Sequence, residues 1–233
     1  MTQPMIHAIP THIIVGFLGA GKTTLLNHLL AQKPAQETWA VLVNEAGQVE
    51  IDATLIVPPE HADNGSIAIK QVIGGCMCCT NHLPMQIALS RLLSQSKPDR
   101  LFIEATGLAH AAQLIQQLSG AHWATALSLR AVLTVINGTN LHDPRLLKHE
   151  NFQAQIANAD IIILSHADVM QPADEDALQQ LIQQGYYQEQ PLIYTAHGKV
   201  LLDQIDVPHV AKLYKARPHK AKTLSTVYKA VKS

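Results

Sequence analysis

The most constraining feature of the sequence is the stretch GFLGAGKTT, from Gly16 to Thr24. It matches the pattern G-x-x-x-x-G-K-[ST] at every fixed position, after an apolar run and before an amphipathic one. Glycines let such a loop curl so that successive backbone N–H groups point inward, and the following helix adds its positive N-terminal end. The sequence therefore predicts a phosphate-binding loop between a strand and a helix. The residues expected to contact phosphate are Gly16, Gly19, Ala20, Gly21, Lys22, Thr23 and Thr24.

Three side chains are predicted to carry the chemistry at this loop. The Lys22 ammonium can reach the β- and γ-phosphates of a nucleotide, and the Thr23 hydroxyl can ligate Mg²⁺. A magnesium site also needs a carboxylate at a neighbouring strand end, and Glu104 closes the apolar run in RLFIEATGL. Gly107 is placed for its N–H to meet a γ-phosphate. We predict Lys22, Thr23 and Glu104 as catalytic residues, with Thr23 and Glu104 as magnesium ligands.

Short apolar runs and longer amphipathic runs alternate along the chain. Strands are expected over residues 12–16, 39–44, 66–72, 100–105, 129–136, 160–165 and 191–196. Helices are expected over residues 22–32, 83–96, 111–120, 146–159 and 173–184. Strands that read as continuous apolar runs are typical of a parallel sheet covered on both faces. The pattern predicts an α/β fold of the P-loop NTPase type, with a mostly parallel sheet and helices on both faces.

Residues after the last two predicted strands are candidates for base recognition. Asp168 follows a strand at the place where GTPases commonly carry Asn-Lys-x-Asp, whose aspartate accepts two hydrogen bonds from guanine. Ser165 and His166 stand here in place of the Asn and Lys; the serine can still hydrogen-bond the loop, and the histidine can lie flat on a base. Backbone N–H groups around Ala196 are placed to meet the guanine O6.

All three cysteines of the chain, Cys76, Cys78 and Cys79, lie in the stretch GGCMCCT. Their odd number argues against a disulfide framework. Thiols near a helix N-terminus become thiolates more readily, and thiolates suit Zn²⁺ or Cu(I). A tetrahedral site would need a fourth ligand, which could come from Glu45, Asp52, His82, water or a thiol of a receiving protein. A redox relay and buried inert cysteines remain open as alternatives to metal binding.

The motifs GFLGAGKTTLLNHLL, VNEAGQVEID, GGCMCCT, EATGLA and QIANADIIILSHAD resemble, in order and spacing, the CobW-type GTPases. That family stands with the nickel-insertion GTPases HypB and UreG, and the resemblance covers about Thr11 to Val200. It implies GTP hydrolysis, binding of zinc or another transition metal, and a metallochaperone role toward a client metalloprotein. It also implies GTP, Mg²⁺ and Zn²⁺ as cofactors, and a transition-metal site at Cys76, Cys78, Cys79 and Glu45.

The sequence departs from the family pattern at three places within the resemblance. The family's NEFGE reads NEAGQ here, so Gln48 replaces a carboxylate and becomes a candidate for orienting the attacking water. Asn137 stands where the family has Asp, and Ser165-His166 alters the base motif. The family's usual second domain does not follow in this sequence, so we expect a short variant, a truncated chain or a protein whose partner supplies the missing half. The predicted units are a GTPase domain over residues 1–207 and a basic tail over residues 208–233, a remnant or the start of a second domain.

Composition narrows the remaining classes of function. No apolar run reaches the ~18–20 residues of a membrane span, and the N-terminal residues read as a strand rather than a signal peptide, so we expect a cytoplasmic protein. Every charged residue after Asp206 is basic, and such a tail can contact nucleic acid or an acidic partner. We favour a solvated, partly helical tail, so nucleic acid is not expected as a partner; a homodimer is compatible with the sequence. The alternative functions are a metal and nucleotide sensor with little hydrolysis, and a P-loop ATPase or kinase with incidental cysteines.

Overall fold

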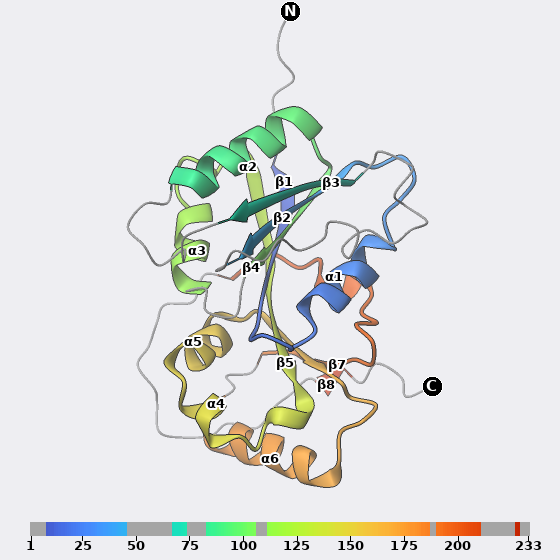
Figure 1. The fold of residues 1–233 in the computed structure, drawn as a ribbon, viewed down its shortest axis with the longest axis vertical. Helices are drawn as coiled ribbons and strands as arrows, with labels where there is room; N and C mark the ends of the chain where they lie inside the picture. The colour runs from blue at the N-terminus through green and yellow to red at the C-terminus, as the bar shows by residue number, and fades with distance from the viewer. Residues whose placement is uncertain are drawn as a thin grey trace, which may run out of the picture.

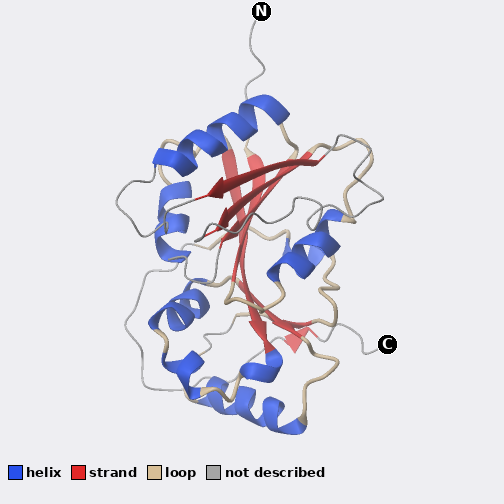
Figure 2. Ribbon diagram, in the orientation of Figure 1, coloured by secondary structure: helices blue, strands red, loops and turns tan. Residues whose placement is uncertain are grey.

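The computed structural model of the 233-residue chain describes residues 8–45, 67–73, 83–105, 111–186, 190–210 and 227–228. Strands and helices alternate in the order that the sequence predicts (Figure 1 and Figure 2). The strands are β1 (Ile9–Val15), β2 (Trp39–Glu45), β3 (Ile67–Ile73), β4 (Arg100–Ala105), β5 (Leu127–Asn137), β6 (Ile161–Ser165), β7 (Leu192–Tyr194) and β8 (Val227–Tyr228). The helices are α1 (Lys22–Leu30), α2 (Leu83–Ser96), α3 (Ala111–Leu118), α4 (Pro144–Lys148), α5 (Glu150–Asn158), α6 (Pro172–Gln183) and α7 (Leu202–Ile205), with a 3₁₀ turn, η2, at Gly138–Asn140.

The described strands form one sheet of eight in the order β3-β2-β4-β1-β5-β6-β7-β8. Every pairing between neighbouring strands is parallel, which confirms the predicted sheet. The first strand of the chain is central, because Ile14 pairs with Glu104 of β4 on one side and with Leu133 of β5 on the other. The loop after β1 therefore opens at a crevice between two neighbouring strands, where ligands of open α/β sheets bind.

Strand β1 shows why the predicted strands read as unbroken apolar runs. Ile13 and Ile14 are both fully buried but belong to separate core clusters on opposite faces of the sheet. Helices α2 and α3 cover one face over β1 to β4, α5 and α6 continue that layer over β5 to β7, and α1 and α7 lie on the other (Figure 1). Burying one such isoleucine contributes about 1.5–3 kcal/mol, so both layers stabilise the central strand.

The helix expected over residues 146–159 is two helices, α4 and α5, and the prediction of one continuous helix was wrong. His149 separates them in an extended conformation, with φ of −72° and ψ of 122°. Its Nδ1 accepts a hydrogen bond of 3.2 Å from the backbone N–H of Asn151 and so caps the start of α5. A side chain that satisfies a free N–H at this point favours a new helix start over a continuous helix.

Charged side chains gather at the amino edge of the sheet, opposite the ends from which the loops leave. The Arg100 guanidinium donates two hydrogen bonds to the Asp206 carboxylate, of 3.1 and 3.0 Å, and Arg130 approaches the same carboxylate at 3.5 Å. His12, fully buried and stacked on Phe102, contacts Arg100 through Nε2 at 2.9 Å. Burial lowers the pKa of His12, and the His12 ring and Arg100 hold the pKa of Asp206 well below its usual value.

A second pair of side chains, His209 and Asp160, lies at the same edge of the sheet beside this network. His209 Nδ1 lies 2.6 Å from Asp160 Oδ2, and both side chains are almost completely buried. Asp160 also accepts a hydrogen bond from the backbone N–H of Val132, and Pro208 forms an antiparallel bridge with Arg130. The segment from Asp206 to His209 is therefore fixed across the start of β5 and the turn before β6. Within the described residues no helix is long and apolar enough to cross a membrane.

Candidate nucleotide site

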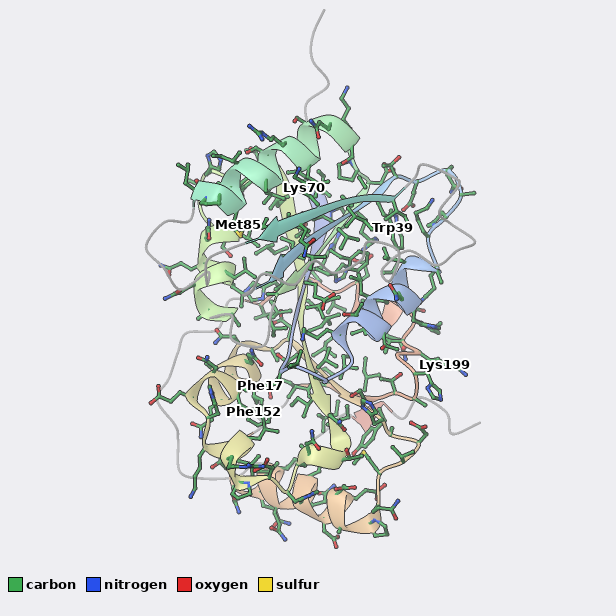
Figure 3. All side chains as sticks on the ribbon, viewed as in Figure 1. Phe17, Trp39, Lys70, Met85, Phe152 and Lys199 are labelled. Carbon is green, nitrogen blue, oxygen red and sulfur yellow. The ribbon has the colours of Figure 1, made fainter. Side chains whose placement is uncertain are left out.

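The predicted phosphate loop connects the end of β1 to the start of α1. Gly16 has a φ of 152°, and a Cβ there would overlap the carbonyl oxygen of Val135 in β5. Gly21 caps α1 in a left-handed conformation, with a φ of 93°. Phe17 anchors the loop: its ring packs edge-on against that of Phe152 in α5, with 5.9 Å between the ring centroids (Figure 3). The first turn of α1 is thereby held at the carboxyl edge of the sheet, with its N-terminal N–H groups available to an anion.

Lys22 and Thr23 occupy the positions that the sequence predicts, in the first turn of α1. The largely buried Lys22 donates from Nζ to the carbonyl oxygen of Phe17, 3.2 Å away in the same loop. Thr23 donates from Oγ1 to Glu104 Oε1 at 3.1 Å. Glu104 is 5% exposed at the end of β4, next to β1. The structure therefore brings together a hydroxyl and a carboxylate that were predicted from separate stretches, 81 positions apart in the chain.

This arrangement has the donor set that Mg²⁺ prefers. A threonine hydroxyl and a carboxylate oxygen 3.1 Å apart are hard oxygen ligands, and they face each other beside a loop that can hold phosphate. Mg²⁺ commonly keeps several waters and takes only one or two protein ligands together with phosphate oxygens. Thr23 and Glu104 fit that pattern, so these two residues could hold the ion directly or through water.

Ser165, at the end of β6, ties the base-recognition loop to the phosphate loop. Its Oγ lies 2.7 Å from the carbonyl oxygen of Ala20 and donates to it, and it lies 2.8 Å from His166 Nδ1. A hydroxyl has one proton, so the second contact requires the imidazole to donate to Ser165. Ser165 thus makes the loop contact that we predicted for it, and it also sets the direction of the His166 ring.

The loop after β7 lies against both α1 and the β6 loop. Gly198 has a φ of 72°, and a Cβ on it would lie only 2.7 Å from the backbone oxygen of Thr24 and 2.8 Å from the nitrogen of Leu25. Thr195 accepts a hydrogen bond of 3.1 Å from the N–H of Ala167. Ala196, predicted for base recognition, sits between these two anchors. The structure therefore places the β7 loop next to the β6 loop that carries Asp168.

Gln32, just beyond α1, was not singled out in the sequence and fixes the other end of that helix. Its side-chain amide donates to the carbonyl oxygen of Val200 at 2.8 Å and accepts from the N–H of Leu202 at 2.9 Å. Burial and the nearby charge of Lys199 lower the pKa of His28 on the same helix. The sequence could not identify Gln32, because a single glutamine after a helix matches no motif. Its partners Val200 and Leu202 lie far away in the chain and meet it only in the folded structure.

Asn137 shows why an amide can replace the family's aspartate at the end of β5. Its Oδ1 accepts hydrogen bonds from the backbone N–H of Thr139 at 3.0 Å and from the Thr139 hydroxyl at 2.8 Å. These contacts cap the η2 turn, and they need an acceptor oxygen rather than a negative charge. In the described structure Asn137 therefore has a local structural role.

Several predicted site residues lie outside the described residues. They are Gln48, Asp52, Cys76, Cys78, Cys79, His82 and Gly107, together with the side chain of Glu45 at the end of β2. Among the residues that the structure describes, no group of three or more His, Cys, Asp or Glu side chains could hold a metal ion. The predicted transition-metal site therefore stays a prediction.

The all-parallel sheet, the loop after its central first strand and the Thr23–Glu104 pair define a P-loop nucleotide-binding domain. Residues 10–191 match the family model described as CobW/HypB/UreG, nucleotide-binding domain. The match covers most of the chain, so the chain belongs to the CobW/HypB/UreG family, as the motif resemblance indicated.

Relatives and solved structures agree with this assignment. The chain is 46% identical over 198 residues to the zinc chaperone YeiR of Escherichia coli (strain K12), covering 85% of this chain and 58% of that protein. It is 30% identical over 195 residues to the zinc chaperone CobW of Pseudomonas aeruginosa, covering 73% and 51%. The crystal structure of Zn(II)-bound YjiA GTPase from E. coli superposes with a TM-score of 0.59 at 24% identity, over 89% of this chain and 67% of that one.

These coverages limit what can be carried over from the relatives. The chain spans between half and three fifths of the length of these two curated relatives. The superposition on YjiA, at 24% identity, shows the fold alone. The two curated relatives therefore align with this chain's nucleotide-binding domain and YjiA shares its fold, while the activity and partners of a whole protein need an argument from this chain.

Proposed function

We propose that this chain is a GTP-hydrolysing domain that binds zinc as cargo and couples its nucleotide state to delivery of the metal to a client metalloprotein. The observation that carries the nucleotide half is the contact between Thr23 and Glu104 beside the phosphate loop, with 3.1 Å between their oxygens. The metal half is supported by the cysteine cluster and by membership of a family whose relatives are named zinc chaperones.

Hydrolysis would depend mainly on positioning and charge. Lys22, which bonds its own loop in the described state, would turn from the Phe17 carbonyl to the β- and γ-phosphates. Thr23 and Glu104 would exchange their mutual hydrogen bond for ligation of the magnesium shell. When bound, Mg²⁺ neutralises charge that develops on the phosphate oxygens. Loop N–H groups and Lys22 would stabilise the same charge without reorganisation at the moment of reaction.

Base selection would rest on Asp168 and the β7 loop. Asp168 lies two residues beyond His166 and is partly exposed. Its carboxylate would accept hydrogen bonds from the guanine N1–H and N2–H₂ groups, and the backbone N–H of Ala196 would donate to O6. Ser165 supports this by holding the β6 loop to Ala20 at 2.7 Å. An adenine base presents the opposite donor and acceptor pattern on this edge, so we expect GTP to be preferred over ATP.

Zinc would be held by Cys76, Cys78 and Cys79, with Glu45 as a further ligand. Thiolates suit zinc, and a fourth position filled by an exchangeable ligand would let a thiol of the client enter before a protein ligand leaves. Cytoplasm is the compartment that we propose, because thiols stay reduced there. Glu45 ends β2, which is separated from β1 and its phosphate loop by β4 alone in the sheet. A change at the nucleotide could therefore reach the metal through a short path.

Single-turnover hydrolysis and chelator competition together test this function. We expect Mg²⁺-dependent hydrolysis of GTP, a loss of that hydrolysis in Lys22→Ala, and weaker competition by ATP. Zinc affinity, measured against a chromogenic chelator, should differ about 5–150-fold between the GDP and GTP-analogue forms, the range of typical couplings. A Cys78→Ser variant should lose zinc binding and keep nucleotide binding. Equal zinc affinity in all nucleotide states would overturn the coupling, and equal ATP and GTP affinity would overturn the guanine assignment.

A further inference from the structure

Two histidines flank the aspartate that we propose as the reader of guanine. His166 precedes Asp168 in the β6 loop, and His197 approaches it from the β7 loop, with 3.8 Å between His197 Nε2 and Asp168 Oδ2. The His197 side chain is 76% exposed and that of Asp168 is 38% exposed. The separation is too long for a hydrogen bond but short enough for attraction between an imidazolium and a carboxylate. His197 therefore faces an atom that a bound guanine would need.

The backbone of the β6 and β7 loops supports the approach of His197 to Asp168. His166 and His197 both have left-handed conformations, with φ of 58° and 54°, which residues with a Cβ adopt sparingly. The β7 loop packs closely on α1, since a Cβ on Gly198 would meet the backbone of its first turn. The hydrogen bond from Ala167 N–H to Thr195 oxygen joins the two loops at 3.1 Å. Left-handed residues outside glycine are concentrated at functional sites.

We propose that His197 is a specificity-determining residue of the base site, which competes with guanine for Asp168 when its ring is protonated. The inference rests on the proposed function, in which Asp168 accepts from guanine. An imidazolium draws the same carboxylate oxygens that the N1–H and N2–H₂ groups must reach. The neutral ring attracts the carboxylate far less, so the aspartate becomes available. Affinity for guanine nucleotides should therefore rise with pH through the range where histidine loses its proton.

Other charged groups near the loop do not reproduce this effect. The titratable and charged groups on the elements packed against it are Asp168 and His166 after β6, Lys199 in the loop itself, and Lys22 and His28 on α1. His166 donates from Nδ1 to Ser165, and this contact fixes the direction of its ring. Lysines stay charged across this range. Among these groups, His197 is the one whose ring lies 3.8 Å from Asp168.

The test compares GDP affinity at about pH 6 and about pH 8 in three forms of the full chain. Wild type should lose about two- to fivefold more affinity at the lower pH than His197→Asn, the range expected for an exposed ion pair. Asparagine also tolerates the left-handed backbone and does not titrate. For each form, the affinity at the higher pH is divided by that at the lower pH. Dividing the wild-type ratio by the variant ratio then cancels the titration of the GDP phosphates, which is the same in both. His166→Asn is the matched control, at the other left-handed histidine, and should keep the wild-type pH dependence.

Two results would overturn the proposal. His197→Asn could keep the wild-type pH dependence, or His166→Asn could abolish it. His197→Gln repeats the test if the asparagine variant melts early in circular dichroism. Asp168→Asn separates this failure from failure of the proposed function, because an asparagine amide can donate to the C2 oxygen of xanthine. If that variant does not shift preference from GTP to XTP, the guanine assignment itself fails. If the preference shifts while His197→Asn stays pH-dependent, only the inference about His197 fails.

Discussion

The two edges of the sheet treat charged side chains in opposite ways. At the amino edge Arg100 and Asp206 make two hydrogen bonds with each other, and their partners belong to strands and turns that cannot move apart cheaply. At the carboxyl edge Lys22 bonds a carbonyl of its own loop, and Thr23 bonds Glu104. In the function that we propose, these contacts are exchanged for phosphate and magnesium. The comparison indicates that stability and ligand binding are assigned to opposite ends of the same strands.

Lys22, in the first turn of α1, and Lys33, three residues after the end of that helix, give the sharpest test of this division. Lys22→Ala should lower single-turnover GTP hydrolysis by about 100-fold or more, because it removes a donor to the charge of the transition state. Lys33 is equally buried, but its Nζ donates to the carbonyl oxygens of Pro34 at 2.7 Å and Glu37 at 2.8 Å. Lys33→Ala should lower the free energy of unfolding by about 1–2 kcal/mol and leave hydrolysis unchanged. The comparison fails if the two variants lose the same property.

Removal of the Asp206 carboxylate should weaken the contacts at the amino edge of the sheet and leave the carboxyl edge unchanged. Asp206→Ala leaves Arg100 and Arg130 close together without their shared counterion. Because Asp206 is partly exposed, we expect a loss of about 1–2 kcal/mol in the free energy of unfolding, measured by urea denaturation. Nucleotide affinity should stay within about twofold of wild type. A large parallel drop in affinity would show that the two edges are coupled.

Two glycines with similar φ angles separate the cost of a left-handed conformation from the cost of close packing. Gly185, with a φ of 75°, has no described atom within 4 Å of the place that an alanine methyl group would take, whereas at Gly198, with a φ of 72°, that methyl group would meet the backbone of α1. Gly185→Ala should cost about 1 kcal/mol for the left-handed conformation alone. Gly198→Ala should cost about 1–2 kcal/mol more and also weaken nucleotide binding. Thermal melts and nucleotide titrations of both variants measure the difference, and equal losses would contradict the close contact.

The amino edge should also make stability depend on pH. The pKa of His12 is lowered in the folded state by burial, so the unfolded chain takes up protons first as pH falls below about 6.5. The pKa of Asp206 is lowered too, so its contribution is lost as pH falls from about 4 downward. We expect the free energy of unfolding, measured by urea denaturation, to fall as pH drops from about 7 to about 5. His12→Gln keeps an acceptor for Arg100 and should reduce that first decline, to which His28 also contributes. The acid decline should become smaller but persist, because Arg100 still lowers the pKa of Asp206.

The approach of Glu104 to the loop after β1 could be predicted from the sequence because it follows rules of local geometry. The glycine pattern from Gly16 to Gly21 and the strand-end position of Glu104 need only the knowledge that carboxyl ends of parallel strands meet at one edge. The pairing of Thr23 with Glu104 confirms that step. His197 was harder to find, because its importance comes from a contact with Asp168 that depends on how two loops fold together.

The amino-edge network could not be predicted from sequence, for a related reason. His12, Arg100 and Asp206 lie on three distant segments, and each alone is an ordinary residue in an ordinary pattern. The broken helix at His149 was missed because the apolar spacing continues across it, and only the cap to Asn151 shows the restart. The short strand β8 offers two residues, too few for any periodicity.

The central place of β1 has a consequence for how the protein is made. Ile9–Val15 is the first described strand to leave a ribosome, but its neighbours β4 and β5 are translated much later. Until then an apolar strand with two open hydrogen-bonding edges must wait in solution, a state prone to aggregation. Nascent chains should therefore acquire nucleotide binding late and abruptly, only after β5 has emerged, and they should need protection by chaperones before that point.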